Sequence, residues 1–299
     1  MKRKRLFGAL LLSAALAFGS SFTIHAGTIV GVPYTESGVK AGPGGAALPE
    51  IARSEEEGKM AALLQAAIDK TNTAESYHII GVMNTTMSIE GVNLPVNTRM
   101  DTRYKGFQTD HAEFLSEMEM DMAGTKMPVQ YFYTDGYLYM DGMGMKTKMQ
   151  LPLEAAIKQA QSGAGFDAVN NTKGMKDLNV TAHDGVQTVY YTYDPAYLNT
   201  YVQEALKMAG QIAAQPSTDV RIDKCVGEAS INGDGYLTNE KISMEMTIET
   251  EAEGKKFSMG MNMFMDSNYI NPGQPVDFTL PSTDGYTEVE QAAAPVQNS

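Results

Sequence analysis

The sequence predicts a mainly β protein of the α+β class. We expect a curved antiparallel sheet of about eleven strands, an unclosed half-barrel, with about three helices on its concave face. From residue 77 onward, apolar and polar residues alternate with a period of two in many short segments, which is typical of strands with one solvated face. Tight-turn dipeptides separate these segments, so consecutive strands should pair antiparallel, and the regular β–α alternation of a parallel sheet is missing.

The N-terminus has the three parts of a secretory signal peptide, predicted at residues 1–26. Four basic residues precede an apolar run, and Ala26 lies where a signal peptidase could cut. The run is shorter than the roughly 20 residues that a membrane span needs, so we expect cleavage and a product without a transmembrane segment. Residues 27–53 are rich in Gly and Pro and predict a flexible leader, and residues 291–299 predict a flexible tail. The chain should therefore be exported, periplasmic or extracellular, and soluble.

A single domain is predicted at residues 54–290, and it begins with a helix. Ser54 and Glu57 have the spacing of a capping box, and apolar residues then recur at helical spacing to about residue 71. Two further helices are expected at 152–162, where Pro152 occupies the first position, and at 196–209.

Strands fill the rest of this domain. Six are expected between residues 77 and 151, a hairpin between 177 and 193, three long strands between 225 and 268, and a Pro-rich closing strand at 275–280. The dipeptides that predict the turns are Glu90-Gly91, Ala123-Gly124, Asp135-Gly136, Asp141-Gly142 and Asp184-Gly185.

The composition excludes several classes of function. The chain of 299 residues has a formal net charge of −13, which argues against nucleic acid and against an anionic lipid surface as partners. Its single cysteine excludes an internal disulfide and a cysteine-based zinc site. No serine elbow, phosphate-binding loop or other catalytic constellation is present, so we expect neither an enzyme nor a cofactor. Cys225 is expected to be a small buried residue without a neighbouring histidine.

Methionine is the most informative residue type in this chain, with 21 copies. Three segments carry it at every second position, so each set should lie on one face of a strand while acidic residues occupy the opposite face. We expect the three sets to lie on adjacent strands, with the second and third side by side in one hairpin, and all three to line a cavity together with two tyrosines. The candidate cavity residues are Met118, Met120, Met122, Met244, Met246, Met259, Met261, Met263, Met265, Tyr131 and Tyr133.

Three interpretations of these methionines remain open. They could fill an ordinary core. They could form an adaptable surface for a variable apolar partner such as an acyl chain, because methionine is flexible and polarizable. They could also bind Cu(I) through their thioethers, although the sequence places no histidine or cysteine next to them.

The order of elements resembles the LolA/LppX-like superfamily of envelope lipoprotein and lipid carriers, and an uncharacterised secreted bacterial branch of it. The segments that carry the resemblance are 117–122 (EMEMDM), 127–142 (MPVQYFYTDGYLYMDG) and 268–289 (NYINPGQPVDFTLPSTDGYTEV). The resemblance implies an eleven-stranded half-barrel whose concave face binds acyl chains without catalysis. It transfers no catalytic residue, and the lipid-anchoring cysteine of several relatives has no counterpart here.

Three functions follow as alternatives. The first is an exported envelope protein that binds a lipid or lipoprotein acyl chain as carrier or sensor, with a possible envelope protein as partner. The second is a methionine-rich copper-binding envelope protein. The third is a structural or interaction module with a closed core.

Overall fold

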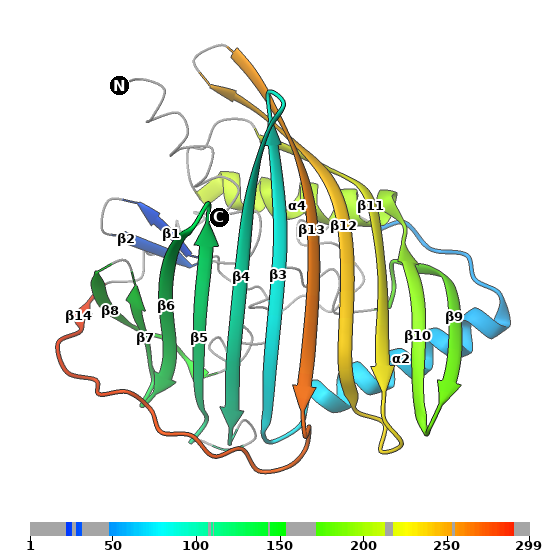
Figure 1. Ribbon diagram of the computed structural model, residues 1–299, viewed down its shortest axis with the longest axis horizontal. Coiled ribbons are helices and arrows are strands. Elements are labelled where there is room, and N and C mark those ends of the chain that lie inside the picture. Colours follow the sequence, from blue (N-terminus) through cyan, green and yellow to red (C-terminus); the bar gives the residue numbers. More distant parts are fainter. Residues whose placement is uncertain are drawn as a thin grey trace, which may run out of the picture.

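One large antiparallel sheet organises the molecule (Figure 1). The computed structural model describes residues 22–25, 28–31, 48–106, 109, 111–142, 144–153, 172–212, 218–252 and 255–289. The main sheet has twelve strands in the order β14-β8-β7-β6-β5-β4-β3-β13-β12-β11-β10-β9. In chain order these are β3 (Tyr77–Ile89), β4 (Val92–Lys105), β5 (Glu113–Met122), β6 (Thr125–Thr134), β7 (Tyr137–Gly142), β8 (Met145–Gln150), β9 (Met175–His183), β10 (Val186–Tyr193), β11 (Thr218–Ile231), β12 (Leu237–Ala252), β13 (Lys255–Ile270) and β14 (Thr287–Glu288).

The sheet consists of two meanders joined at its centre. Strands β3 to β8 follow one another outward on one side, and β9 to β13 follow one another inward from the other edge. The last long strand, β13, pairs antiparallel with the first, β3, which joins the two series. Strands β14 and β9 form the two ends and do not pair with each other, so the sheet stays open. This arrangement confirms the predicted fold class, a curved, unclosed antiparallel sheet.

The tight turns follow from dipeptides that tolerate a left-handed backbone. Both residues of four predicted turns have positive φ angles, as two-residue hairpin turns require. The fifth prediction, a turn at Asp141-Gly142, is wrong. Both residues belong to β7, where Asp141 pairs with Lys146 of β8 and their charged groups lie 3.2 Å apart. Gly144, with φ of +77°, lies beyond them in the connection to β8.

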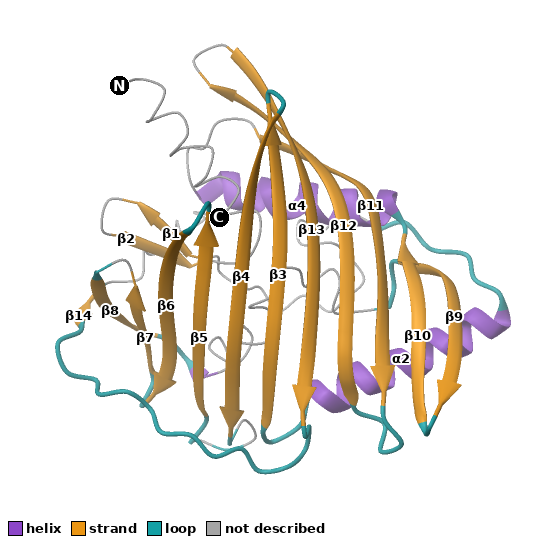
Figure 2. Ribbon diagram, viewed as in Figure 1, coloured by secondary structure: helices purple, strands orange, loops and turns teal. Residues whose placement is uncertain are grey.

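Two helices lie on one face of the sheet, which we call the inner face (Figure 2). Helix α2 (Glu55–Asn72) begins with the predicted capping box between Ser54 and Glu57, and its main contacts are with β9, β11 and β12. Helix α4 (Pro195–Ile212) lies against β11. The helix expected at 152–162 lies outside the described residues except for its first two positions.

Polar side chains attach α4 to the part of β11 that pairs with β12 on one side and with no described strand on the other. β10 pairs with β11 only up to Val226, so among the described residues no strand pairs with this edge of β11 toward its N-terminal end. The Asn199 amide accepts a hydrogen bond from the Ile222 backbone N–H at 2.6 Å and donates one to the Ile222 carbonyl at 3.0 Å. Gln203 donates to the Val220 carbonyl at 2.8 Å. The helix therefore satisfies backbone groups that would otherwise form an open sheet edge.

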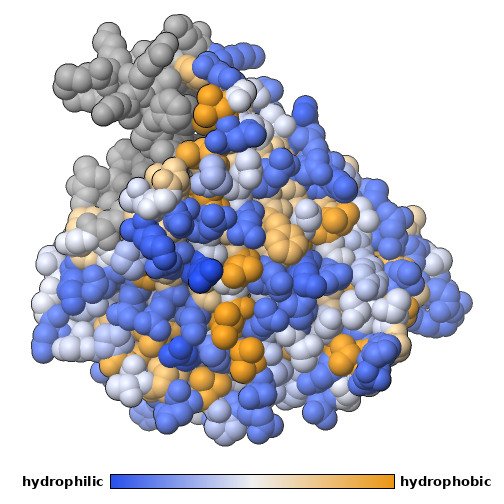
Figure 3. All heavy atoms as spheres, in the orientation of Figure 1, coloured by the Kyte–Doolittle hydropathy of each residue, from blue (hydrophilic) through white to orange (hydrophobic). Residues whose placement is uncertain are grey.

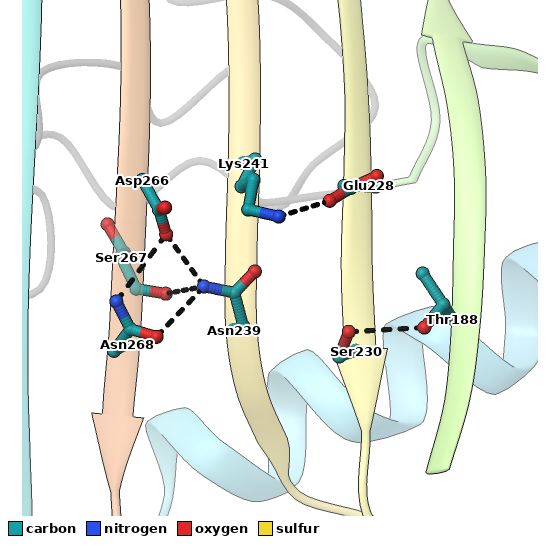
Figure 4. Close-up of polar contacts among 8 residues, drawn as sticks. All are labelled: Thr188, Glu228, Ser230, Asn239, Lys241, Asp266, Ser267 and Asn268. Carbon is teal, nitrogen blue, oxygen red and sulfur yellow. Dashed lines mark hydrogen bonds and ion pairs between the residues drawn. The ribbon is translucent and has the colours of Figure 1, made fainter. Parts of the chain in front are cut away.

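The opposite, outer face faces the viewer in Figure 3, where it is mostly hydrophilic. Over β10 to β13 it carries a polar network (Figure 4). Asn239 donates to the side chains of Asp266 and Asn268 on β13, and Lys241 forms an ion pair of 2.6 Å with Glu228 on β11. These cross-strand contacts stabilise the register in which the methionine-bearing face points inward.

A segment after β13 covers part of the outer face at the other end of the sheet. Phe278 is buried against Leu115, Phe132 and Tyr139, and Tyr286 packs edge-on to the ring of Tyr139. The segment runs along the strand ends to β14, which pairs in parallel with β8 (Figure 1). The prediction of a strand at 275–280 is therefore wrong. These residues alternate because one side of the segment is buried, but they have no place in the strand order of the sheet.

The predicted ends of the chain lie largely outside the described residues. A short antiparallel hairpin, β1 (Phe22–His25) with β2 (Thr28–Gly31), lies on either side of the predicted cleavage point. The tail at 291–299 lies wholly outside the described part. Export and cleavage stay predictions. Neither of the two described helices has the length and apolar character that crossing a membrane requires.

Candidate functional site

The inner face carries methionines over most of its width. Strands β12 and β13 pair so that Met244 lies opposite Met263, and Met246 lies opposite Met261. This confirms the prediction that the second and third methionine sets lie side by side. The acidic residues between them, such as Glu245, are exposed on the outer face. The strict alternation fixes this outcome, because a slip by one residue would bury the carboxylates.

Both helices cover this part of the inner face. Leu64 and Ile68 of α2 and Leu198 of α4 are buried in one cluster with the methionines of β12 and β13. The buried methionines of this covered half are 0–8% exposed, so they form packed core. They are Met87, Met175, Met244, Met246, Met259, Met261, Met263 and Met265.

The first methionine set lies elsewhere on the same face. The expectation of three adjacent methionine strands is wrong, because β3 and β4 lie between β13 and β5. The intervening strands carry methionines of their own, which extend the surface across the gap. Six half-buried methionines from β3, β4, β5 and β6 form what we call the half-buried methionine patch: Met83, Met100, Met118, Met120, Met122 and Met127.

The strand register shows that this patch is continuous. Met83 lies opposite Thr98, which in turn lies opposite Met120, and Met120 lies opposite Met127. One row along the strands, Met100 lies opposite Met118. Because directly paired residues have Cβ atoms about 5 Å apart, these side chains form one apolar surface.

Aromatic side chains close one end of the patch. Tyr77 and Tyr104 stack with ring centroids 4.5 Å apart, and Phe114 and Tyr133 stack at 6.0 Å. Tyr133 is buried and donates a hydrogen bond to the Leu151 carbonyl at 3.1 Å, so it belongs to the core rather than to an open surface. The other predicted tyrosine, Tyr131, is half-buried on the same face, and burial raises the pKa of its hydroxyl.

Sequence reasoning missed a buried carboxylic acid on the covered half. Glu240 is 7% exposed and accepts a hydrogen bond of 3.1 Å from the Tyr191 hydroxyl. Burial raises the pKa of Glu240 to about 7. The sequence did contain a signal, because Glu240 lies two residues before Ile242 and therefore shares the inward face of the methionine strand.

The single cysteine lies closer to the methionines than expected. Cys225 of β11 pairs directly with Met244, which pairs with Met263, so three sulfur-bearing residues form one row across three strands. Cys225 is fully buried, and burial raises the pKa of its thiol to about 12, which keeps the thiol protonated. Within the described part of the chain, no group of three or more His, Cys, Asp or Glu side chains could hold a metal ion.

Two polar positions lie on the inner face of the other half. Thr102 and Ser116 are buried and share a hydrogen bond of 2.8 Å. Thr98, four residues before Thr102 on the same face of β4, is also buried, and its hydroxyl has no hydrogen-bond partner among the described residues. None of these three residues stood out in the sequence, and threonine in particular is common in strands.

Comparisons with known proteins supply a family and distant structural likenesses. A search of curated proteins finds no match. Among solved structures, the chain is similar to LprF from Mycobacterium bovis, with 14% identity over 75% of this chain and 98% of that one, at a TM-score of 0.41. A DUF1329 family protein from Desulfovibrio piger is similar at 10% identity over 72% and 91%, with a TM-score of 0.22. The model of DUF6612, a family of unknown function, matches residues 59–282. Since this match spans most of the chain, the protein belongs to the DUF6612 family.

Proposed function

We propose that this protein binds an apolar, chain-shaped ligand, such as the acyl chain of a lipid or lipoprotein, against the half-buried methionine patch. In this proposal it is an exported envelope protein that acts as a carrier or sensor and performs no catalysis. The observation that carries the proposal is the division of one methionine face into two parts. The β12 and β13 part is packed under helices, whereas the six methionines of β3 to β6 stay half-buried.

The composition of the patch supports an apolar and variable ligand. Methionine has three rotatable bonds and a polarizable sulfur, so a surface of six such side chains adapts to chains of different shape. On the outer face of the same strand, Glu119 pairs with Lys126 at 2.7 Å, so β5 separates charge and apolar surface cleanly.

The experiment measures saturable binding of a fluorescent fatty-acyl probe to the purified chain. We expect the wild type to bind and a Met118→Glu, Met120→Glu variant to lose binding, because two carboxylates would then occupy the patch. The matched control is Glu117→Gln, Glu119→Gln, which changes the outer face of the same strand and should leave binding intact. Native mass spectrometry of protein from its own envelope should show a lipid mass. A wild type that takes up no probe and carries no lipid would refute the proposal.

Copper binding is a second candidate because of the row formed by Cys225, Met244 and Met263. Soft sulfur ligands suit Cu(I), but this row lies in the covered half, and its thiol is protonated when no metal is bound. A copper mass in native mass spectrometry that disappears in a Cys225→Ser variant would favour this candidate. A bare polypeptide would favour a structural or interaction module.

A further inference from the structure

Thr98 is a buried polar residue in the middle of the half-buried methionine patch. It lies on the inner face of β4, with Met83 opposite on β3 and Met120 opposite on β5. Along its own strand, the neighbours on the same face are Val96 and Met100. Four apolar side chains therefore surround one hydroxyl group.

This hydroxyl differs from the buried hydroxyl of Thr102, which lies on the same face of the same strand. Thr98 is 7% exposed, and within the described ranges its Oγ1 atom has no hydrogen-bond partner. Thr102, two pleats along the same face, is equally buried but shares a hydrogen bond with Ser116. A buried hydroxyl without a partner destabilises a protein, and valine would fit the same space without that cost. The position therefore requires a hydrogen-bond partner that the described part of the chain does not supply.

We propose that Thr98 determines the ligand specificity of the patch by donating a hydrogen bond to an uncharged carbonyl group of the bound molecule. This inference rests on the proposed function and names its ligand class, a neutral acyl ester or amide. A hydrocarbon would leave the hydroxyl unsatisfied, and a free carboxylate would be buried among methionines without a counter-charge. The patch continues on both sides of Thr98, toward Met118 and toward Met122, so apolar parts of the ligand would lie on either side of the carbonyl group.

The experiment compares three pyrene-labelled probes of equal chain length: a fatty-acid methyl ester, an alkane and a free fatty acid. We expect the wild type to bind the ester most tightly. Thr98→Val should weaken ester binding about tenfold, the worth of one buried hydrogen bond, and change alkane binding by less than about twofold. Thr98→Ser, which keeps a hydroxyl, should retain most of the ester affinity. The thermal midpoint of unliganded Thr98→Val should equal or exceed that of the wild type.

The matched control is Thr102→Val, on the same strand and face. It removes a hydroxyl that is already paired, so it should lower the thermal midpoint and leave the preference for ester over alkane unchanged. Equal ester affinity in the wild type and Thr98→Val overturns the inference and leaves the proposed function standing. Equal losses for ester and alkane also overturn it, because Thr98 would then be merely structural. A wild type that binds none of the three probes refutes the proposed function and this inference together.

Discussion

Both halves of the inner face carry methionines, but these methionines differ in how deeply they are buried. On β12 and β13, methionines at alternate positions are almost completely buried, for example Met244 at 1% and Met246 at 2% exposed. On β5, methionines with the same spacing, Met118 and Met120, stay half-buried. The described helices contact mainly β9, β11 and β12. At the other end of the sheet, Met140 of β7 and Met149 of β8 are also buried, at 8% and 2% exposed, in a cluster with aromatic side chains. Methionine at every second position of a strand therefore predicts only that this face points inward. Tertiary packing decides whether the face is core or surface.

On the outer face, polar side chains lie behind the helix-covered half and apolar side chains behind the other half. Behind the helix-covered half it carries the polar network of Asn239, Lys241 and their partners (Figure 4). Behind β5 to β7 it carries the apolar cluster in which Phe278 is buried. The half with the fewest contacts to the described helices thus gains part of its burial from the outer side. Such support would let the inner surface stay available without loss of the strands that present it.

The first prediction compares the two halves directly and has the largest effect. Met246→Glu with Met261→Glu places two carboxylates under the helices, where an unpaired buried charge costs several kcal/mol. The sum approaches the whole stability of a typical domain, about 5–15 kcal/mol, so we expect no cooperatively folded protein. Met118→Glu with Met120→Glu should cost only about 1 kcal/mol per site, because half-buried carboxylates keep contact with water.

Urea denaturation followed by circular dichroism measures both variants. The conservative pair Met246→Gln with Met261→Gln tests whether charge or size is responsible, and should destabilise less than the glutamate pair. Similar losses of stability at the two sites would contradict the division of the inner face into a packed and a half-buried part.

Sequence periodicity predicted most of the strands but could not predict how distant strands associate. The alternation between residues 77 and 151 gave six strands and most of their turns, because local pattern and turn chemistry agree there. It could not place Met118 relative to Met263. Strand β13 pairs with β3, so β3 and β4 lie between Met263 on β13 and Met118 on β5. Strand order of this kind depends on contacts distant in sequence, which no local pattern encodes.

Two further differences between the prediction and the structure also arise from contacts between residues distant in sequence. Val276, Phe278 and Leu280 alternate as a strand does, but the pattern reflects one buried side and not a ladder of hydrogen bonds. For the candidate site, the methionines were predictable from their spacing. Glu240 and Thr98 were not singled out, because their importance comes from burial and from the partners around them.

The second prediction uses the buried acid of the covered half. Because the pKa of Glu240 rises to about 7 in the folded protein, the folded state binds its proton more tightly than the unfolded chain does. The resulting stabilisation is complete below about pH 4.5 and is lost as the pH rises to about 7, by roughly 3 kcal/mol at 1.36 kcal/mol per pKa unit. Glu240→Gln removes the ionisation, so the variant should gain stability relative to the wild type over this range.

Urea denaturation at pH 5 and at pH 8 gives the difference between variant and wild type at each pH. Glu245→Gln, on the exposed side of the same strand, is the control and should show no such pH-dependent difference. If the difference in unfolding free energy between Glu240→Gln and the wild type is the same at both pH values, burial does not raise the pKa of Glu240.

The third prediction has the smallest effect and separates packing from adaptability. Met246→Leu with Met261→Leu changes shape in a tight core and should cost up to about 1.5 kcal/mol per site. Met118→Leu with Met120→Leu should hardly change stability, because half-buried side chains can relax. The patch variant should instead bind acyl probes over a narrower range of chain lengths, since leucine has fewer rotatable bonds than methionine. Thermal denaturation measures the loss of stability. Titrations with acyl probes of about 8 to 18 carbons, chains that fit within a bilayer core of about 30 Å, measure the range of chain lengths that bind. If the core variant alone altered the range of chain lengths, the ligand would bind in the helix-covered half, and the assignment of the two halves would have to be exchanged.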